Sequence, residues 1–200
     1  MALILEALVT TLNPDGSANV APMGPRVDAE MARFVLRPFK TSTTYRNLIR
    51  HGEGVLHVTD DVLMLARAAI GMDPRAATRA AEVVHGRVIL TSCRYYEFRV
   101  DEIDDREDRV TIVASTVASG RLRDYFGLNR GKHAVVEAAI LATRTRILPL
   151  DEIAADFHRL LAPVEKTGGP DEIEAFAMLC RFVKTEAQAQ GRNDLEFGPS

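Results

Sequence analysis

The sequence is poor in cysteine and lacks the spacings that metal sites require. Its two cysteines, Cys93 and Cys180, stand far apart and form no CxxC pair. The five histidines also show no pattern of metal ligands. We therefore expect neither a disulfide framework nor a metal site.

Long apolar runs and an excess of positive charge are also absent. The apolar start, residues 1–12, is interrupted by Glu6, lacks a basic segment and is too short to cross a bilayer. The formal net charge of −3 argues against a nucleic-acid-binding protein that relies on bulk charge. We expect no membrane partner and no nucleic-acid partner, and a cytoplasmic location is the default.

Loops typical of nucleotide-binding and nucleophile motifs are not recognisable. The chain contains no GxGxxG, Walker or GxSxG motif and no internal repeat. It does contain 46% hydrophobic and 26% charged residues, which is typical of a globular protein with a sizeable core. Its 200 residues fit one large domain, or one domain with an appendage.

Alternation and turn residues predict a mainly antiparallel β structure over residues 1–128. The turn Asn13-Pro14-Asp15-Gly16 joins strands expected at 3–12 and 17–23. Runs rich in β-branched and aromatic residues predict further strands at 31–36, 55–59, 93–103 and 110–117.

Helical patterns interrupt this β structure and follow it. Asp60 is expected to cap one helix, and Asp73-Pro74 to begin another that continues through the Ala-rich run 75–83. Later in the chain, apolar residues at helical spacing predict three helices, at 132–148, from 151 onward, and at 173–183. We assign residues 129–186 to a helical appendage and residues 187–200 to a loose tail.

One segment, RPFKTSTTYRNLIRHG at residues 37–52, predicts a helix that begins in a row of hydroxyl residues. Thr41 or Ser42 can serve as the N-cap, and Gly52 ends the helix. A helix start has unpaired N–H groups and a partial positive charge, so it attracts anions. Three basic residues accompany it: Arg37, Lys40 and Arg46. The segment is either a phosphate-binding cradle or an ordinary capped surface helix.

A second segment, Asn19 to Gly24, ends a strand in a way that regular pairing does not accommodate. The run Pro22-Met23-Gly24-Pro25 prevents a regular ladder, so backbone amides there can face a ligand. If this strand end and the helix start at Lys40 to Thr44 are neighbours, one would receive a planar ring and the other a phosphate.

Four motifs stand out when these segments are read together with the rest of the chain. They are DGSANVAPMG, RPFKTSTTYRNL, GVLHVTDD and NRGKHAVVEAAILATR, the last at Asn129 to Arg144. In combination they resemble the FMN-binding split-barrel superfamily, which includes flavin-reductase-like and pyridoxamine-phosphate-oxidase-like proteins. The chain is most similar to a branch of unknown function, over residues 2–185. The resemblance implies an α+β, mainly β fold: an FMN-binding split β-barrel with helical excursions and a C-terminal three-helix appendage.

The resemblance also implies which residues bind the cofactor, FMN. They are Asn19, Val20, Ala21, Pro22, Met23 and Gly24 at the ring edge, Lys40, Thr41, Ser42, Thr43 and Thr44 with Asn47 at the phosphate, His57, Val58 and Thr59 on a strand against the flavin, and Arg130 at the phosphate or the interface. Proteins of this superfamily usually act as homodimers with the flavin near the subunit interface, so a homodimer is expected.

The implied activity is that of an FMN-dependent oxidoreductase of unknown substrate, with a nicotinamide or a deazaflavin as the small-molecule electron donor. His57 is either a proton donor, because imidazole titrates near neutral pH, or a structural histidine. No catalytic residue is assigned. Two alternatives stay open: a non-catalytic flavin-binding sensor or carrier, and a cofactor-biosynthesis accessory protein whose helical part, residues 132–183, docks a partner.

Overall fold

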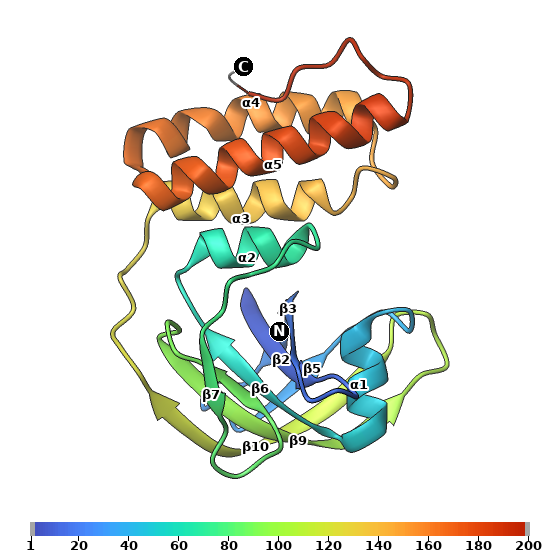
Figure 1. Cartoon of the computed structure of the whole chain (residues 1–200), viewed down its shortest axis with the longest axis vertical. Coiled ribbons are helices and arrows are strands. Elements are labelled where there is room, and N and C mark those ends of the chain that lie inside the picture. Colours follow the sequence, from blue (N-terminus) through green and yellow to red (C-terminus); the bar gives the residue numbers. More distant parts are fainter. Residues whose placement is uncertain (1–2, 199–200) are drawn as a thin grey trace. The chain divides into compact units, whose positions relative to one another are not determined.

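The computed structural model describes residues 3–198 and divides the chain into two compact units. The sheet unit comprises Met1–Asp60 and Arg75–Tyr125, and the helical unit comprises Asp61–Pro74 and Phe126–Ser200. Figure 1 shows the strands of the sheet unit in blue to yellow-green and the C-terminal helices in orange and red. The helix expected after Asp60 therefore groups with the C-terminal helices, whereas the sequence suggested that it belongs with the strands.

Within the described residues, ten strands and one helix build the sheet unit. The strands are β1 (Leu3–Ile4), β2 (Ala7–Leu12), β3 (Ala18–Met23), β4 (Arg26–Val27), β5 (Arg33–Leu36), β6 (Glu53–Val58), β7 (Thr78–Ala80), β8 (Arg87–Ile89), β9 (Arg94–Asp104) and β10 (Thr111–Arg121), and the helix is α1 (Thr43–His51). Eight strands form one antiparallel sheet in the order β1-β4-β5-β10-β9-β6-β2-β3, and β7 pairs with β8. The mainly antiparallel β structure predicted from the sequence is confirmed.

One bent hairpin curls the large sheet. β2 pairs with β3, and β1 pairs with β4, because the chain bends between β1 and β2 and again between β3 and β4. At the bend the Leu5 N–H donates to the Pro25 carbonyl at 3.1 Å. β2 also pairs with β6, while β4 pairs with β5, so the same hairpin stands at both ends of the sheet. The sheet is thereby curled into a half-barrel, and one side of β3 keeps a free edge.

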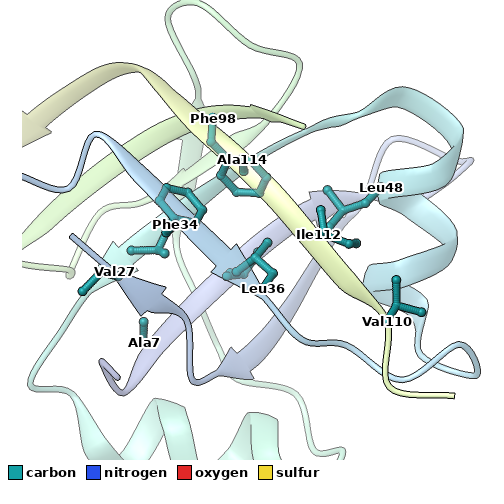
Figure 2. Packing of buried hydrophobic residues seen from close by; sticks show 11 residues of the cluster. Ala7, Val27, Phe34, Leu36, Leu48, Phe98, Val110, Ile112 and Ala114 are labelled. Atoms are coloured by element: carbon teal, nitrogen blue, oxygen red, sulfur yellow. The ribbon is translucent and has the colours of Figure 1, made fainter. Parts of the chain in front are cut away.

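An apolar core fills the curled sheet. Phe34 on β5 and Phe98 on β9 meet edge to face, with ring centroids 5.2 Å apart. Figure 2 shows these rings near Leu36 and Ile112, with Leu48 reaching in from α1. All five side chains are buried. Leu48 therefore anchors α1 to the core of the sheet unit.

The predicted turn between β2 and β3 is confirmed as a three-residue hairpin loop. The Gly16 N–H donates to the Asn13 carbonyl at 3.0 Å, and the Asn13 N–H donates to the Ser17 carbonyl at 2.9 Å. Gly16 has a φ of 81°, a left-handed conformation that glycine adopts without strain. The hydrogen-bonded pair of Asn13 and Ser17 sets the register of β3.

The helix expected over residues 73–83 is wrong. The chain there runs as a loop into β7, whose Thr78 pairs with Ile89 of β8. Arg75 has a φ of 56°, which a right-handed helix does not permit. The Ala-rich composition favours a helix only weakly, and tertiary hydrogen bonds override it.

Two glutamates supply those hydrogen bonds. Glu97, fully buried on β9, accepts from the three consecutive N–H groups of residues 82–84 at 2.8, 2.7 and 3.0 Å. Glu53, on the neighbouring strand β6, accepts from the His85 N–H at 2.8 Å. Four successive N–H groups thus point at carboxylates, which holds the loop between β7 and β8 against the large sheet.

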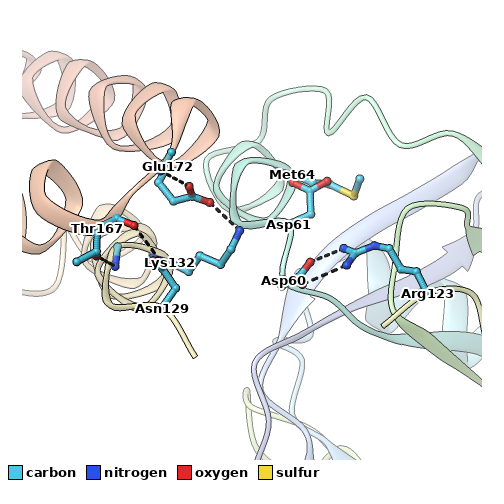
Figure 3. Close-up of polar contacts among 10 residues, drawn as sticks. Asp60, Asp61, Met64, Arg123, Asn129, Lys132, Thr167 and Glu172 are labelled. Carbon is cyan, nitrogen blue, oxygen red and sulfur yellow. Dashed lines mark hydrogen bonds and ion pairs between the residues drawn. The ribbon is translucent and has the colours of Figure 1, made fainter. Parts of the chain in front are cut away.

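A salt bridge joins two places where the chain leaves the sheet unit. The Arg123 guanidinium, after β10, pairs with both carboxylate oxygens of Asp60, after β6 (Figure 3). Arg123 also donates from Nε to the Thr91 carbonyl at 2.8 Å. Asp60 is therefore not the helix cap that the sequence suggested. Asp61 is the cap, and it accepts from the Met64 N–H at 2.9 Å.

The helical unit contains α2 (Val62–Ala69), α3 (Arg130–Ala142), α4 (Leu150–Thr167) and α5 (Pro170–Ala189). The three C-terminal helices predicted from the sequence are confirmed, although α3 ends at Ala142 and turns fill the residues before Pro149. No helix within residues 3–198 is both long and apolar enough to cross a membrane.

The start of α3 packs on the junction between α4 and α5. The Asn129 side chain caps α3 and donates to the Thr167 carbonyl at 2.8 Å. Gly131 lies so close to Gly168 that an added Cβ would be 2.9 Å from the Gly168 Cα. Lys132 pairs with Glu172 at 2.7 Å, and both side chains are largely buried (Figure 3). Glycine and this ion pair fix how the three helices meet.

The end of the described chain differs from the loose tail expected over residues 187–200. α5 continues to Ala189, and Arg192 then pairs with Asp151 at 2.8 Å. Phe197 is buried and packs against Phe157, with ring centroids 6.0 Å apart. A single apolar anchor in a polar run holds this segment on the helices, and hydrophobic periodicity cannot reveal one residue.

We expect Glu97→Gln to lower the free energy of unfolding by about 2 to 3 kcal/mol. The amide keeps one acceptor oxygen and turns an N–H donor toward N–H groups. Urea unfolding should show a lower midpoint at an unchanged slope. Glu102→Gln, exposed on the same strand, is the matched control and should have the wild-type midpoint. Equal midpoints for the two variants would contradict the anchoring role of Glu97.

Candidate functional site

The first turn of α1 has the free N–H groups of an anion-binding helix start. Ser42 is the N-cap, with extended backbone (φ −76°, ψ 150°), and its Oγ accepts from the Tyr45 N–H at 3.1 Å. Within residues 3–198, the N–H groups of Thr43 and Thr44 have no partner. The helix dipole adds partial positive charge at the same place. The predicted helix start in the row of hydroxyls is confirmed.

Two cationic side chains accompany this helix start. Lys40 is half-buried, and its Nζ has no hydrogen bond or ion pair with any residue that the structure describes. Arg46 folds back and donates to the Thr41 carbonyl at 2.7 Å and to the Thr43 hydroxyl at 3.0 Å. The third expected cation, Arg37, instead donates to a carbonyl of the β9–β10 turn at 3.3 Å.

α1 is fastened to the β2–β3 hairpin by buried polar side chains. The Asn47 Nδ2 donates to the Thr11 Oγ1 and to the Asn13 Oδ1, both at 3.0 Å. The Asn19 Nδ2 donates to the same Thr11 Oγ1 at 3.2 Å and to the Thr44 Oγ1 at 3.1 Å. The structure therefore brings Asn19 of β3 next to the helix start, while β3 pairs regularly with β2 through Met23, where the sequence predicted an interrupted ladder. It also engages Asn19, Thr44 and Asn47 with the protein itself.

No strand among the described residues pairs with the outer side of β3, so peptide groups there are unpaired. Hydrogen-bonded pairs alternate along an antiparallel ladder, and the first is Asn13 with Ser17. The continuous register then directs the backbone N–H and C=O groups of Asn19 and Ala21 toward β2. The backbone groups of Val20 and Pro22 point outward. Every residue of β3 is half-buried. Proline has no N–H to lose, so it suits an outward position on an edge strand.

His57, expected on a strand against the flavin, lies on β6 and not on this edge. It is fully buried on β6, where Nδ1 lies 3.3 Å from the Leu8 carbonyl and Nε2 accepts from the Ile89 N–H at 3.0 Å. Burial lowers its pKa from 6.5 to about 4, despite the opposing hydrogen bond to Leu8. The neutral ring is a structural link between three strands, and it is not placed to donate a proton.

The other expected residues have varied surroundings. Val58 is half-buried against the sheet core, and its carbonyl accepts from the Cys93 N–H at 2.9 Å. Thr59 is half-buried after β6. Gly24 lies at the hairpin bend, where an added Cβ would be 3.3 Å from the Ile4 Cγ2. Arg130 belongs to the helical unit, exposed in the first turn of α3. None of these four is among the side chains that link β3 to α1.

Sequence reasoning missed Thr11 and Asn13, the residues that receive Asn47. One signal was present: Thr44, Asn47 and His51 follow one another at the spacing of a single helix face. A polar stripe on the face beside Leu48 indicates docking on another polar segment. It does not tell which segment, because the partners lie more than thirty residues earlier.

Comparisons with known proteins place these features in context. Sequence models of the N-terminal and C-terminal parts of a family described as protein of unknown function (DUF447) match residues 5–123 and 129–181. Among solved structures, the chain is similar to an FMN-bound protein of Methanosarcina mazei assigned to the same family. The two share 21% identity and a TM-score of 0.74, over 91% of this chain and 96% of that one.

Two further solved structures share the fold over a smaller part of the chain. A 2-nitrobenzoate 2-nitroreductase of Pseudomonas fluorescens is 20% identical, covers 60% of this chain and 66% of its own, and has a TM-score of 0.52. A flavoredoxin of Desulfovibrio vulgaris is 12% identical, covers 60% and 69%, and has a TM-score of 0.52. The fold class and the resemblance to the FMN-binding split-barrel superfamily are thereby confirmed.

Because His57 is buried, we expect the free energy of unfolding to depend on pH. Below pH 6.5 the unfolded chain binds a proton that the folded chain refuses until about pH 4, so the free energy of unfolding falls as the pH drops through this interval. The expected loss is on the order of 3 kcal/mol. Urea unfolding across the interval should show it, and His57→Gln should lose that part of the dependence.

The exposed His133 offers the control for this experiment. His133→Gln should keep the wild-type dependence on pH. If His57→Gln also keeps it, the acid-sensitive group lies elsewhere and His57 is not the neutral link described above.

Proposed function

The chain belongs to the DUF447 family, and from this premise we propose that it binds FMN and acts as a flavin-dependent oxidoreductase on a small-molecule substrate. One observation carries the proposal: a helix start with two free N–H groups is hydrogen-bonded, through Thr44 and Asn19, to a strand with a free edge. FMN carries a flat ring at one end and a phosphate at the other. A single FMN molecule can therefore occupy both the strand edge and the helix start. The similar protein of Methanosarcina mazei is FMN-bound.

The helix start suits a phosphate monoester. The N–H groups of Thr43 and Thr44 would donate to its oxygens, and the Ser42 hydroxyl, whose lone pair already accepts from Tyr45, keeps its proton for a further hydrogen bond. Lys40 supplies a charge without a protein partner within residues 3–198, and Arg46 supplies a second. Hydrogen bonds to a charged group are the stronger kind, so this end supplies much of the affinity.

The edge of β3 suits the rim of the flavin ring. The outward peptide groups of Val20 offer one donor and one acceptor, and Pro22 offers a carbonyl. The polar rim of the ring carries carbonyl acceptors and one N–H, which can pair with such groups. Because these are backbone groups of a paired strand, the ring would be oriented by the sheet itself.

Bound flavin would supply the hydride and electron chemistry. This chain would bind it, orient it and leave a face accessible to a second small molecule, a nicotinamide or a deazaflavin. Hydride transfer to the ring needs no acid or base from the protein, so the structural role of His57 is compatible with this activity. We assign no catalytic residue.

A non-catalytic flavin carrier or sensor is the second candidate. The observation that favours it is the same histidine: His57, which the sequence suggested as a proton donor, is buried with both nitrogens engaged. A carrier needs the phosphate and ring contacts alone.

We further propose that the protein is a homodimer in the cytoplasm. Leu3 and Ile4 on β1 are 68% and 57% exposed. Leu3 lines an open groove of about 680 Å³ whose walls also include Val27, Phe34 and Val113. A second copy would remove this apolar surface from water. Both cysteines are free and buried, which suits a reducing compartment.

FMN binding is tested by titration, followed through flavin fluorescence. We expect wild-type protein to bind FMN and Lys40→Ala to bind it about tenfold more weakly, because a charged partner of the phosphate is lost. Riboflavin, which has no phosphate, should bind both proteins equally. Lys184→Ala, exposed on α5, is the control and should match the wild type. A wild type that leaves the fluorescence of added FMN unchanged would remove the proposal.

Turnover separates the oxidoreductase from the carrier. FMN-loaded protein should oxidise NADH, NADPH or a reduced deazaflavin in the presence of an artificial electron acceptor, faster than the same concentration of free FMN. Absorbance of the donor measures this. A loaded protein that is no faster than free FMN with all three donors would favour the carrier.

A further inference from the structure

The helix that carries the proposed phosphate site docks through a polar face. Thr44, Asn47 and His51 lie along one side of α1 and face the β2–β3 hairpin. Thr44 is 2% exposed, Asn47 is 1% exposed and Thr11 beneath them is fully buried. Polar groups removed from water in this way destabilise a fold unless they are paired. The hydrogen bonds of these three side chains therefore matter for how α1 docks.

Thr11, Thr44 and Asn47 each have a partner, and the hub is the Thr11 hydroxyl, whereas the buried Nδ1 of His51 has no partner within residues 3–198. The Thr11 Oγ1 accepts from Asn47 at 3.0 Å and from Asn19 at 3.2 Å. Each amide uses its second N–H on another partner, Asn13 for Asn47 and Thr44 for Asn19. A continuous chain of hydrogen bonds thus runs from the hairpin turn to the second residue of α1.

The other end of the helix is held as well. Arg50 donates to the Leu12 carbonyl, and the His51 Nε2 lies 3.2 Å from the same oxygen. Hydrogen bonds have directions, whereas apolar contacts tolerate sliding. α1 is consequently fixed along the hairpin in one register. That register sets the distance from the free N–H groups of Thr43 and Thr44 to the outward peptide groups of β3.

We propose that Thr11 and Asn47 are positioning residues for the flavin: they hold the phosphate site and the ring edge at the spacing that one FMN molecule spans. This inference rests on the proposed function. Both side chains are buried, so neither touches the ligand. When two sites bind the two ends of one ligand, the second contact depends on how well the spacing matches. Loosening α1 reduces the contribution of the phosphate and leaves that of the ring.

The readout is the preference for FMN over riboflavin, measured as the ratio of the two dissociation constants. Thr11→Val keeps the shape of the hub and removes its hydroxyl, and Asn47→Leu removes one arm at similar volume. We expect the preference to fall about tenfold in each variant, with the riboflavin constant within about twofold of the wild type.

Thr10→Val is the matched control. Thr10 is the neighbouring residue on β2, equally buried, but its hydroxyl donates to the Arg87 carbonyl and has no part in the α1 network. All three variants should have lower unfolding midpoints than the wild type. Only Thr11→Val and Asn47→Leu should lose preference for FMN. Because the constants are measured on folded protein, stability alone does not move the ratio.

The outcomes separate the two ideas. If the wild type prefers FMN and both variants keep that preference while their midpoints fall, the network is structural only and the positioning role is overturned. If Thr10→Val loses the preference equally, the effect is a general one of β2 and the inference also fails. A wild type that binds neither flavin overturns the proposed function, and with it the positioning role.

Discussion

The pairing of one hairpin with two different strands determines the curled shape of the sheet unit. β2 pairs with β6, β4 pairs with β5, and the bend between them lets a single pair of segments serve both ends of the sheet. The curl that results encloses Phe34 and Phe98. It also leaves β3 with one partner, because β2 is already flanked on its other side. The open edge is therefore a direct product of how the half-barrel is formed.

Buried polar groups determine how the loops and the helix that leave this sheet pack against it. Glu97 directs the loop after β7, His57 accepts from Ile89 of β8, and the Thr11 hub holds α1. Each uses directional bonds where an apolar contact would allow several arrangements. Such groups are costly when unpaired, so they favour one arrangement over its neighbours. The sheet unit gains a defined geometry for its loops in this way, and the proposed ligand site lies on one of the loops so defined.

The sequence predicted what depends on local chemistry and on matching motifs. The turn at Asn13–Gly16, the cap at Ser42 and the three C-terminal helices were confirmed, because glycine, serine and apolar periodicity act within a few residues. The helix over 73–83 was wrong, because Glu97 reaches the loop from another strand. The part played by His57 and by Thr11 also depends on partners far along the chain. From the sequence alone, the helix start is either a phosphate-binding cradle or an ordinary capped helix, and His57 is either a proton donor or a structural histidine. Only tertiary contacts distinguish these alternatives.

The edge of β3 matters to the protein when no small molecule lies against it. An unpaired strand is a template onto which a strand of another copy can be added, and growth by such addition leads to fibres. Pro22 interrupts the row of outward donors, so an incoming strand would find one of its carbonyls unmatched. Pro22, which lies on the edge proposed to receive the flavin ring, therefore also protects the ligand-free protein against polymerisation.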